Sequence, residues 1–317
     1  MRIVLTGSIA FDYLMTFPGR FKDHILLERL ERLSLSFLVD SLVQQRGGIA
    51  ANIGYTMALL GQEPAIMASA GKDFHDYKQW LEKHGVNTEA IKIYPDLYTA
   101  SFFVSTDETN AQIASFYSGA MARAAELSLH NLPEKPELVM VSANDPSAME
   151  SCIEECRQLG IPYMYDPSQQ TVRLEAAPLK DGIRSCEALF VNDYEFELIR
   201  DKTRLTIDQI LQNSAFVVIT EGEKGASIHA KDGVIKIPAV EPSEIVDPTG
   251  VGDAFRAGFL CGYLNDFSLE RCGQMGSVAA SFCLENQGPQ GHHFSIASFQ
   301  ERFQQNFDDQ GDLEKLA

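Results

Sequence analysis

The sequence lacks the features that direct a chain into or across a membrane. No run of 18 apolar residues occurs among its 317 residues, and the apolar stretch within 1–7 is too short for a secretory signal. We therefore expect no membrane segment and a cytoplasmic location. The chain also lacks low-complexity tracts and internal repeats, while 45% of its residues are hydrophobic, so we expect ordinary globular folding.

Basic residues are scarce in this chain. The 26 Lys and Arg residues face 44 Asp and Glu residues, which gives a formal net charge of −18. This charge opposes binding to nucleic acids and to anionic lipids, so we expect a small-molecule partner. Any phosphate site must then be built locally from backbone amides, one or two basic side chains and Mg²⁺.

Cysteine is sparse as well, and its spacing shows no metal site. The six cysteines are scattered, and no pair has ligand spacing with histidines nearby. We interpret all six as reduced and mostly buried thiols. The first strand also ends without a G-x-G-x-x-G motif, which disfavours a dinucleotide-dependent dehydrogenase.

Short apolar runs alternate with helix-length segments over most of the chain. Six runs predict strands that are buried on both faces: 3–6, 65–70, 138–142, 162–165, 188–191 and 216–220. Helical periodicity is found at 50–60, 77–84, 149–159, 194–200, 254–264, 269–284 and 298–307. This alternation predicts a single domain over 1–317, an α/β fold that is a three-layer α/β sandwich with a mainly parallel central sheet.

Two stretches interrupt this alternation. Residues 11–45 have no clean strand–helix pattern, and residues 98–117 have the pattern of two strands around a polar turn. We predict that two insertions, about 12–46 and 97–118, form a small β lid subdomain. The alternative is a pair of surface hairpins without a role in binding. The sequence leaves open whether the protein is a monomer or a homodimer formed through the lid.

The segment 247–255 carries the strongest signal in the sequence. It joins a strand-like run, 235–246, to an apolar helix, and the residues Gly250–Gly252 leave backbone N–H groups free at the helix N-terminus, where an anion is favoured. We call Gly250–Gly252 the phosphate seat, and Asp253 follows it directly in the sequence. Because a carboxylate repels phosphate, Asp253 is better explained as a base that takes a proton from an attacking hydroxyl. The combination predicts a small-molecule kinase; the alternative is an Asp-Pro turn before an ordinary helix.

Two further elements suit an acceptor substrate. Asp12 lies beyond the carboxyl end of the first strand, where ligands gather, and could accept hydrogen bonds from vicinal hydroxyls or occupy an exposed turn. Gly47 and Gly48 precede a helix of small residues, which lets a ligand approach the backbone closely. Asn52 in the first turn of that helix offers a donor and an acceptor, or packs locally.

Two elements suit a nucleotide. Asn192 and Glu195 are three residues apart at a predicted helix start, so they could hold Mg²⁺ through water or form a capping box. The loop after strand 216–220 could follow a triphosphate or close a hairpin. Its candidate residues are Thr220, Gly222, Lys224 and Gly225.

In order and spacing, these elements resemble the ribokinase family, also called the PfkB carbohydrate kinase family, across nearly the whole chain. The resemblance implies a ribokinase-like fold with ATP and Mg²⁺ as ligands. For the acceptor, it implies a substrate pocket formed by Asp12, Gly47, Gly48 and Asn52. For phosphoryl transfer, it implies Asp253 as the base and an anion hole formed by Gly250, Val251 and Gly252. For the nucleotide, it implies a Mg-phosphate motif at Asn192 and Glu195, a nucleotide loop with Thr220, Gly222 and Gly225, and an adenine-binding wall at Ala279–Gly288.

Four further positions lie in or beside the motif. Val251 departs from the family's pattern, which has a small residue there, and its β-branched side chain crowds the approach of the phosphate. The family's monovalent cation, K⁺, would be held by Asp247 and Thr249. We interpret Arg256, one turn below Asp253, as a solvated helix charge, with a contribution to catalysis as the alternative.

The hairpin at 98–117 contains residues that could recognise the acceptor substrate. Its aromatic residues could stack on a nucleobase or pack in the core; they are Phe102, Phe103, Phe116 and Tyr117. Asn110 and Gln112 could read the polar edge of a base. The pattern from Thr106 to Ile113, with the tail around Phe255–Phe259, resembles the nucleoside kinases of the family.

We therefore expect transfer of the γ-phosphoryl group of Mg·ATP to a primary hydroxyl of a nucleoside, adenosine-like first. A free-sugar kinase acting on ribose or fructose is the alternative. A non-catalytic nucleotide or sugar binder is the alternative of another class, and Asp253 argues against it, because a binder needs no base.

Overall fold

The computed structural model describes residues 2–25 and 34–316, so residues 26–33 of the predicted lid lie outside the described part. Nine of the described strands form a large sheet: β1 (Ile3–Thr6), β4 (Ala65–Gly71), β5 (Ile91–Tyr94), β8 (Leu138–Ser142), β9 (Tyr163–Asp166), β10 (Ala188–Asn192), β11 (Phe216–Thr220), β12 (Ala226–Ala230) and β13 (Gly233–Ile237). Their order is β13-β12-β11-β10-β9-β8-β1-β4-β5, and all neighbours are parallel except at β12 and β13.

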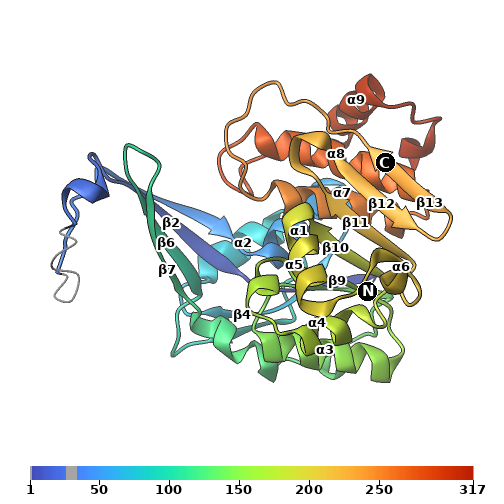
Figure 1. Cartoon of the computed structure of the whole chain (residues 1–317), viewed down its shortest axis with the longest axis horizontal. Helices are drawn as coiled ribbons and strands as arrows, with labels where there is room; N and C mark the ends of the chain where they lie inside the picture. Colours follow the sequence, from blue (N-terminus) through green and yellow to red (C-terminus); the bar gives the residue numbers. More distant parts are fainter. Residues whose placement is uncertain (1, 26–33, 317) are drawn as a thin grey trace.

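Helices cover both faces of the large sheet (Figure 1). One face carries α1 (Ile49–Leu59), α2 (His75–Lys83), α7 (Val251–Leu264) and α8 (Leu269–Leu284), with α9 (Ile296–Asn306) packed on α8. The other carries α3 (Pro146–Leu159), α4 (Ala176–Ile183), α5 (Asp193–Thr203) and α6 (Ile207–Leu211). The predicted three-layer α/β sandwich is therefore confirmed.

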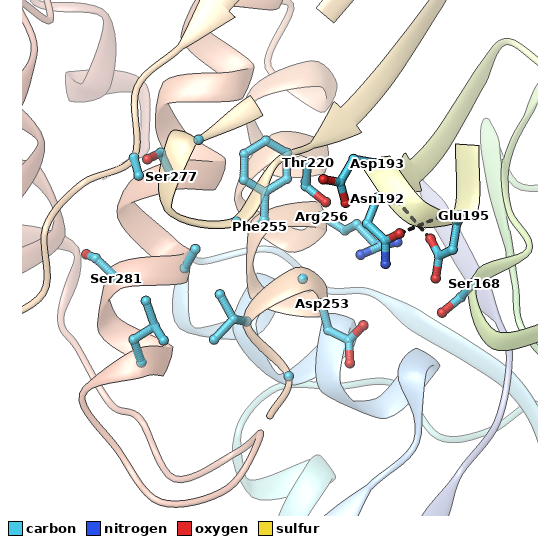
Figure 2. Close-up of a pocket in the computed structure, with 18 of the residues that line it drawn as sticks. Ser168, Asn192, Asp193, Glu195, Thr220, Asp253, Phe255, Arg256, Ser277 and Ser281 are labelled. Carbon is cyan, nitrogen blue, oxygen red and sulfur yellow. Dashed lines mark hydrogen bonds between the residues drawn. The ribbon is translucent and has the colours of Figure 1, made fainter. Parts of the chain in front are cut away.

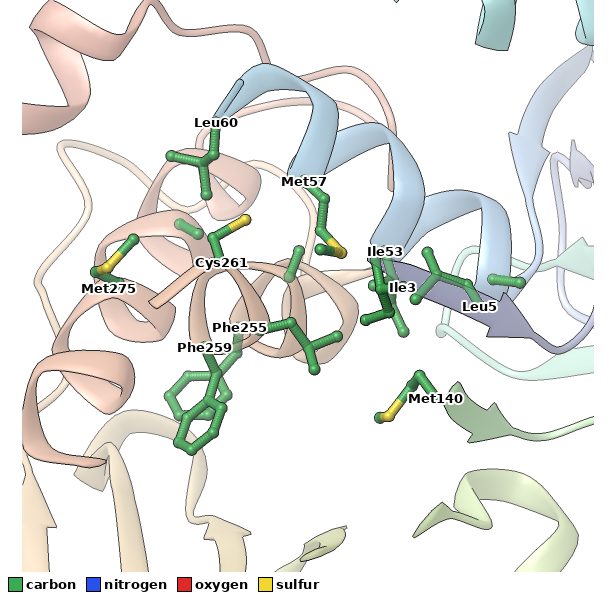
Figure 3. Close-up of a cluster of buried hydrophobic side chains, with 14 of the residues drawn as sticks. Ile3, Leu5, Ile53, Met57, Leu60, Met140, Phe255, Phe259, Cys261 and Met275 are labelled. Atoms are coloured by element: carbon green, nitrogen blue, oxygen red, sulfur yellow. The ribbon is translucent and has the colours of Figure 1, made fainter. Parts of the chain in front are cut away.

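Alternate residues of the parallel strands supply two separate cores. Leu5 in β1 points into the cluster under α1 and α7, while its neighbour Val4 points into the cluster under α3 and α5. Figure 3 shows the first cluster, in which Ile53 and Met57 of α1 face Phe255 and its neighbours on α7. Because side chains of α7 are buried against α1, the start of α7 is held rigidly at the carboxyl edge of the sheet.

A smaller sheet projects from one end of the molecule, at the left of Figure 1. Its described strands are β2 (Ala10–Thr16), β3 (Ser41–Gly47), β6 (Ala100–Thr106) and β7 (Gln112–Tyr117), in the order β3-β2-β6-β7. The register sets Gln45, Asp12, Phe102 and Phe116 side by side across the four strands. We call this sheet the lid.

One predicted strand is wrong. The sequence predicts a strand over 235–246 that leads into the phosphate seat, but β13 ends at Ile237 and the chain then continues without regular structure to Gly250. Pro238 and Pro242 fall in this run, and a proline has no N–H to donate to a neighbouring strand. The sequence pattern does not predict the helices α4 and α6 or the edge strand β5.

All six cysteines are free and buried, as expected. Among the described helices, none has the length and apolar character needed to cross a bilayer.

Candidate active site

Two adjoining pockets lie at the carboxyl edge of the large sheet. The large pocket has a volume of about 610 Å³ and is bounded by α5, α8, the start of α7 and the loop after β11. The lid pocket, of about 310 Å³, lies between the lid and the start of α1. Four residues line both: Ser168, Gln169, Gly250 and Asp253. Asp253 therefore lies where the two pockets meet.

The N-terminus of α7 opens onto both pockets. Gly250 is its N-cap with φ +81°, and a Cβ there would lie 2.4 Å from the Cβ of Pro289, so glycine is required. The first N–H groups of a helix have no partner within it, and the helix dipole adds positive potential at this end. Val251 begins the helix and lines the large pocket beside these amides, at the position where a small residue was expected. The arrangement suits a phosphate group.

Asp253 projects from the first turn of α7 into this space (Figure 2). Burial raises the pKa of its carboxyl group, and the nearby Arg256 and a hydrogen bond from Asn52 offset part of that rise. The Nδ2 of Asn52 donates to Asp253 Oδ2 over 2.8 Å. A carboxylate held in this way can accept a proton from a hydroxyl in the lid pocket.

A chain of hydrogen bonds fixes the amide of Asn52. The Nε2 of Gln290 donates to Asn52 Oδ1 over 3.0 Å and also to the hydroxyl of Tyr77. The Tyr77 hydroxyl in turn donates to the carbonyl of Gly47 over 2.9 Å. Gly48, the N-cap of α1 with φ +94°, lies so close to Ser8 that a Cβ would be 2.5 Å from its carbonyl oxygen. The Gly-Gly turn therefore sets the position of Asn52.

Asp12 lies on the lid and faces the lid pocket. Its Oδ2 lies so close to Gly47 that a Cβ added to Gly47 would be 2.5 Å from this oxygen. Burial raises the pKa of Asp12 to about 6, and repulsion from Asp253 and Asp247 adds to the rise. Of the four residues assigned to a substrate pocket, Asp12, Gly48 and Asn52 line the same cavity as Asp253, whereas Gly47 does not line it. Their contact with a substrate stays a prediction.

The hairpin aromatics divide between the two faces of the lid. Phe102 and Phe116 are directly opposite each other on β6 and β7, and both line the lid pocket. Phe103 instead stacks on Tyr13, with ring centroids 4.7 Å apart. Phe116 is 45% exposed, so it is not a core residue. Gln112 lies outside both pockets: it is exposed, and its Nε2 donates to Thr106 Oγ1 over 3.3 Å.

The predicted nucleotide residues line the large pocket. Asn192 caps α5 by accepting from the N–H of Glu195 over 2.7 Å, and Glu195 Oε2 accepts from the N–H of Asn192 over 2.9 Å (Figure 2). The capping box is therefore real, and both side chains still border the pocket. The other lining residues predicted from the sequence are Thr220, Gly222 and Gly225, together with Ala280, Ser281 and Leu284 of the expected adenine wall. Lys224 is exposed and does not line it.

The structure contradicts the interpretation of Arg256 as a solvated helix charge. Its side chain is 7% exposed and forms a two-point ion pair with Asp166, in which Nη2 donates to Oδ1 over 2.8 Å and Nε lies 2.6 Å from Oδ2. Burial raises the pKa of Asp166 to about 7, and attraction to Arg256 offsets part of that rise. The partner comes from the end of β9, ninety residues earlier in the chain, and the charge count of α7 alone does not reveal it.

Asp247 is held by backbone and side-chain donors. Its Oδ1 accepts from the N–H of Thr249 over 2.9 Å, and its Oδ2 accepts from Gln287 Nε2 and from the N–H of Gly288, each over 2.9 Å. Thr249 lines the lid pocket. Binding of K⁺ at this pair stays a prediction.

Sequence reasoning missed the turn after β9. Ser168 and Gln169 border both pockets, and Ser168 has φ +43°, a left-handed conformation that is uncommon for serine and concentrates at functional sites. The turn follows a predicted strand at its carboxyl end, so the rule that identified Asp12 would also have identified it.

The fold and the site together define a phosphotransferase that acts on a hydroxyl group. A helix N-terminus for phosphate, a buried carboxylate for the hydroxyl proton and separate pockets for two substrates are the parts that such a reaction needs. The model of the pfkB family of carbohydrate kinases matches residues 9–293, and the chain belongs to this family.

Individual relatives agree with this assignment. The chain is 32% identical over 293 residues to a nucleoside kinase of Methanothermobacter thermautotrophicus, covering 91% of each chain. It is 29% identical over 291 residues to a nucleoside kinase of Methanocaldococcus jannaschii, covering 91% of this chain and 92% of the relative. A solved nucleoside kinase of Burkholderia thailandensis in complex with inosine is 34% identical, with a TM-score of 0.87, and the match covers 96% of this chain and 98% of that one.

Proposed function

We propose that this protein is a nucleoside kinase that transfers the γ-phosphoryl group of Mg·ATP to the primary hydroxyl of a purine nucleoside, with adenosine-like nucleosides preferred. The observation that carries the proposal is the lid pocket, which is lined by the cross-strand neighbours Phe102 and Phe116 together with Asp12 and Asp253. An aromatic pair suits a planar base, and Asp12 suits the hydroxyls of a ribose.

The large pocket would hold ATP, with its phosphates toward the start of α7. Asp253 takes the proton of the attacking hydroxyl, a new O–P bond forms, and the bond between the γ-phosphorus and the bridging oxygen of ADP breaks. The N–H groups at the start of α7 stabilise the charge on the transferring group. The products are ADP and the nucleoside monophosphate, and the proton remains on Asp253 until it exchanges with solvent.

The oxygen groups of Asn192 and Glu195 fit a Mg²⁺ ion, because both line the large pocket and Mg²⁺ prefers a carboxylate, water and phosphate oxygens. When bound, the ion neutralises charge on the β- and γ-phosphates. Glu195 would hold it through water, since one of its oxygens is engaged in the capping box.

The relatives support a nucleoside as acceptor over a free sugar. The kinases of Methanothermobacter thermautotrophicus and Methanocaldococcus jannaschii are nucleoside kinases, and the structure from Burkholderia thailandensis holds inosine, a purine nucleoside. K⁺ binding at Asp247 and Thr249 is part of the proposal on the family resemblance alone.

An acceptor panel tests the proposal. Purified protein with Mg·ATP is given adenosine, inosine, guanosine, cytidine, ribose or fructose, and ADP release and the phosphorylated product are measured. We expect a purine nucleoside to have the highest kcat/KM. Equal or higher kcat/KM on ribose or fructose would leave a sugar kinase, and ligand binding without ADP release would leave a non-catalytic binder.

A further inference from the structure

The large pocket is acidic for a site that receives a triphosphate. Asp193, Glu195 and Asp253 line it, and among the described lining residues of both pockets Arg256 is the one Lys or Arg. The whole chain carries a net charge of −18, so no general positive field compensates for these carboxylates. Arg256 is therefore the cationic side chain that the described lining of the two pockets offers to a phosphate.

The ion pair of Arg256 occupies two nitrogens of its guanidinium and leaves the third, Nη1, on the side of the phosphate seat. Asp166 occupies the edge formed by Nε and Nη2. The remaining nitrogen, Nη1, lies against the anion-hole turn, since a Cβ on Gly252 would be only 2.8 Å from it. Figure 2 shows the side chain extending from α7 toward Asn192 and Glu195, on the same side of the helix as Asp253.

Helix geometry couples this guanidinium to the base. Asp253 and Arg256 are three residues apart on α7, so their side chains share a face. The ion pair with Asp166 removes the rotational freedom of a long side chain before any ligand arrives, which lowers the cost of using it in the reaction. A buried ion pair by itself contributes little to stability, because desolvation of both charges offsets their attraction.

We propose that Arg256 is a catalytic residue whose Nη1 donates hydrogen bonds to the transferring γ-phosphoryl group, with Asp166 as the positioning residue that aims it. This inference rests on the proposed function, because it requires phosphoryl transfer in the large pocket. Arg256 keeps its protons throughout; it stabilises negative charge that increases on the equatorial oxygens and on the leaving ADP.

The test compares Arg256→Gln and Arg256→Lys with the wild type, using Mg·ATP and the acceptor that the wild type prefers. We expect Arg256→Gln to lower kcat by about 10²–10³-fold, the usual cost of one transition-state donor, while the Kd of ATP changes less than about tenfold. Addition of guanidinium chloride at millimolar concentration and constant ionic strength should raise the kcat of Arg256→Gln at least tenfold. A folded Arg256→Gln protein with kcat within threefold of the wild type, or without rescue, would overturn the proposal.

Arg256→Lys covers the case in which the glutamine variant fails to fold. Lysine can pair with Asp166 but cannot also reach the Gly252 side, so kcat should fall at least tenfold with little change in melting temperature. Unchanged kcat in this variant would assign the pair to stability alone.

Arg271→Gln is the matched control, because Arg271 is a buried arginine that pairs with Asp312 and lines neither pocket. It should lose stability but keep kcat and show no guanidinium response. A kcat loss and rescue as large as in Arg256→Gln would count against a specific role for Arg256. Since Arg256 acts on the phosphoryl group, its effect is the same for any acceptor, and the wild-type acceptor panel decides the proposed function separately.

Discussion

Asn52 donates its Nδ2 hydrogen to Oδ2 of Asp253 over 2.8 Å, joining the first turn of α1 to the first turn of α7. The bond favours the ionised form of Asp253, which burial otherwise disfavours. Residues 201 positions apart in the sequence are thus combined into one proton-accepting unit at the boundary of the two pockets.

Asp253→Asn should abolish most turnover without loss of ATP binding. The asparagine oxygen can still accept the bond from Asn52, so the local structure is kept, but an amide cannot take the hydroxyl proton. We expect kcat to fall by about 10²–10⁴-fold. Steady-state kinetics and ATP titration by calorimetry measure the two effects. Retention of more than about a tenth of the wild-type kcat would exclude Asp253 as the base.

Gln290→Leu should weaken catalysis through Asn52. The Nε2 of Gln290 is the donor to Asn52 Oδ1, and without it the amide can turn and present its oxygen to the carboxylate of Asp253. We expect kcat to fall about tenfold and the acid limb of the kcat profile to move to higher pH, because Asp253 loses a bond that lowers its pKa.

Gln79→Leu, at an exposed glutamine that contacts His75 on α2, is the control and should leave the profile unchanged. An unmoved acid limb in Gln290→Leu would show that Asn52 keeps its orientation without Gln290.

Much of this architecture could be predicted because it depends on local patterns. Strands buried on both faces are continuous apolar runs, and they identified β1, β4 and β8 through β11 directly. The phosphate seat was predictable because a glycine-rich junction and the following helix are adjacent in the sequence.

The features that could not be predicted depend on contacts between residues that are far apart in the sequence. The sequence of α7 makes Arg256 resemble a surface charge, and only the packing of β9 against α7 supplies Asp166. Strand alternation does not give the distance of Gln112 from the pocket, and in the structure Gln112 lies outside the pocket lining and bonds to Thr106. Its contact with a substrate stays a prediction. The sequence likewise predicts that Phe102 and Phe103 lie on opposite faces of the hairpin, because they are adjacent in a strand. Which of the two faces lines the pocket depends on the pairing with β2 and β7, which the sequence does not reveal.

Asp12→Ala should raise the KM of the acceptor far more than that of ATP. A charge-assisted hydrogen bond to a hydroxyl contributes about 1.5–3 kcal/mol, so the acceptor KM should rise about 10- to 150-fold. Equal changes in both constants would mean that Asp12 supports the lid without contacting the substrate.

The same residue predicts a pH dependence. The pKa of Asp12 is raised to about 6, so its carboxylate form is complete only above pH 7 and is lost as pH falls through 6. The wild-type kcat/KM for the acceptor should therefore be level above pH 7 and decline below 6. A profile that stays level down to pH 5 would contradict an essential ionised Asp12.

Phe116→Ala should lower the preference for nucleosides over free ribose. Phe116 lies beside Phe102 on the face of the lid that lines the lid pocket, and one stacked base contributes about 1–3 kcal/mol, so kcat/KM for the preferred nucleoside should fall about 5- to 150-fold while that for ribose changes little. Phe103→Ala removes an aromatic ring from the same hairpin on the opposite face, where it stacks on Tyr13, and serves as the matched control. If both variants reduce nucleoside and ribose turnover alike, the rings stabilise the lid and do not read the base. If Phe116→Ala alone narrows the nucleoside-to-ribose ratio, stacking in the lid pocket determines the acceptor.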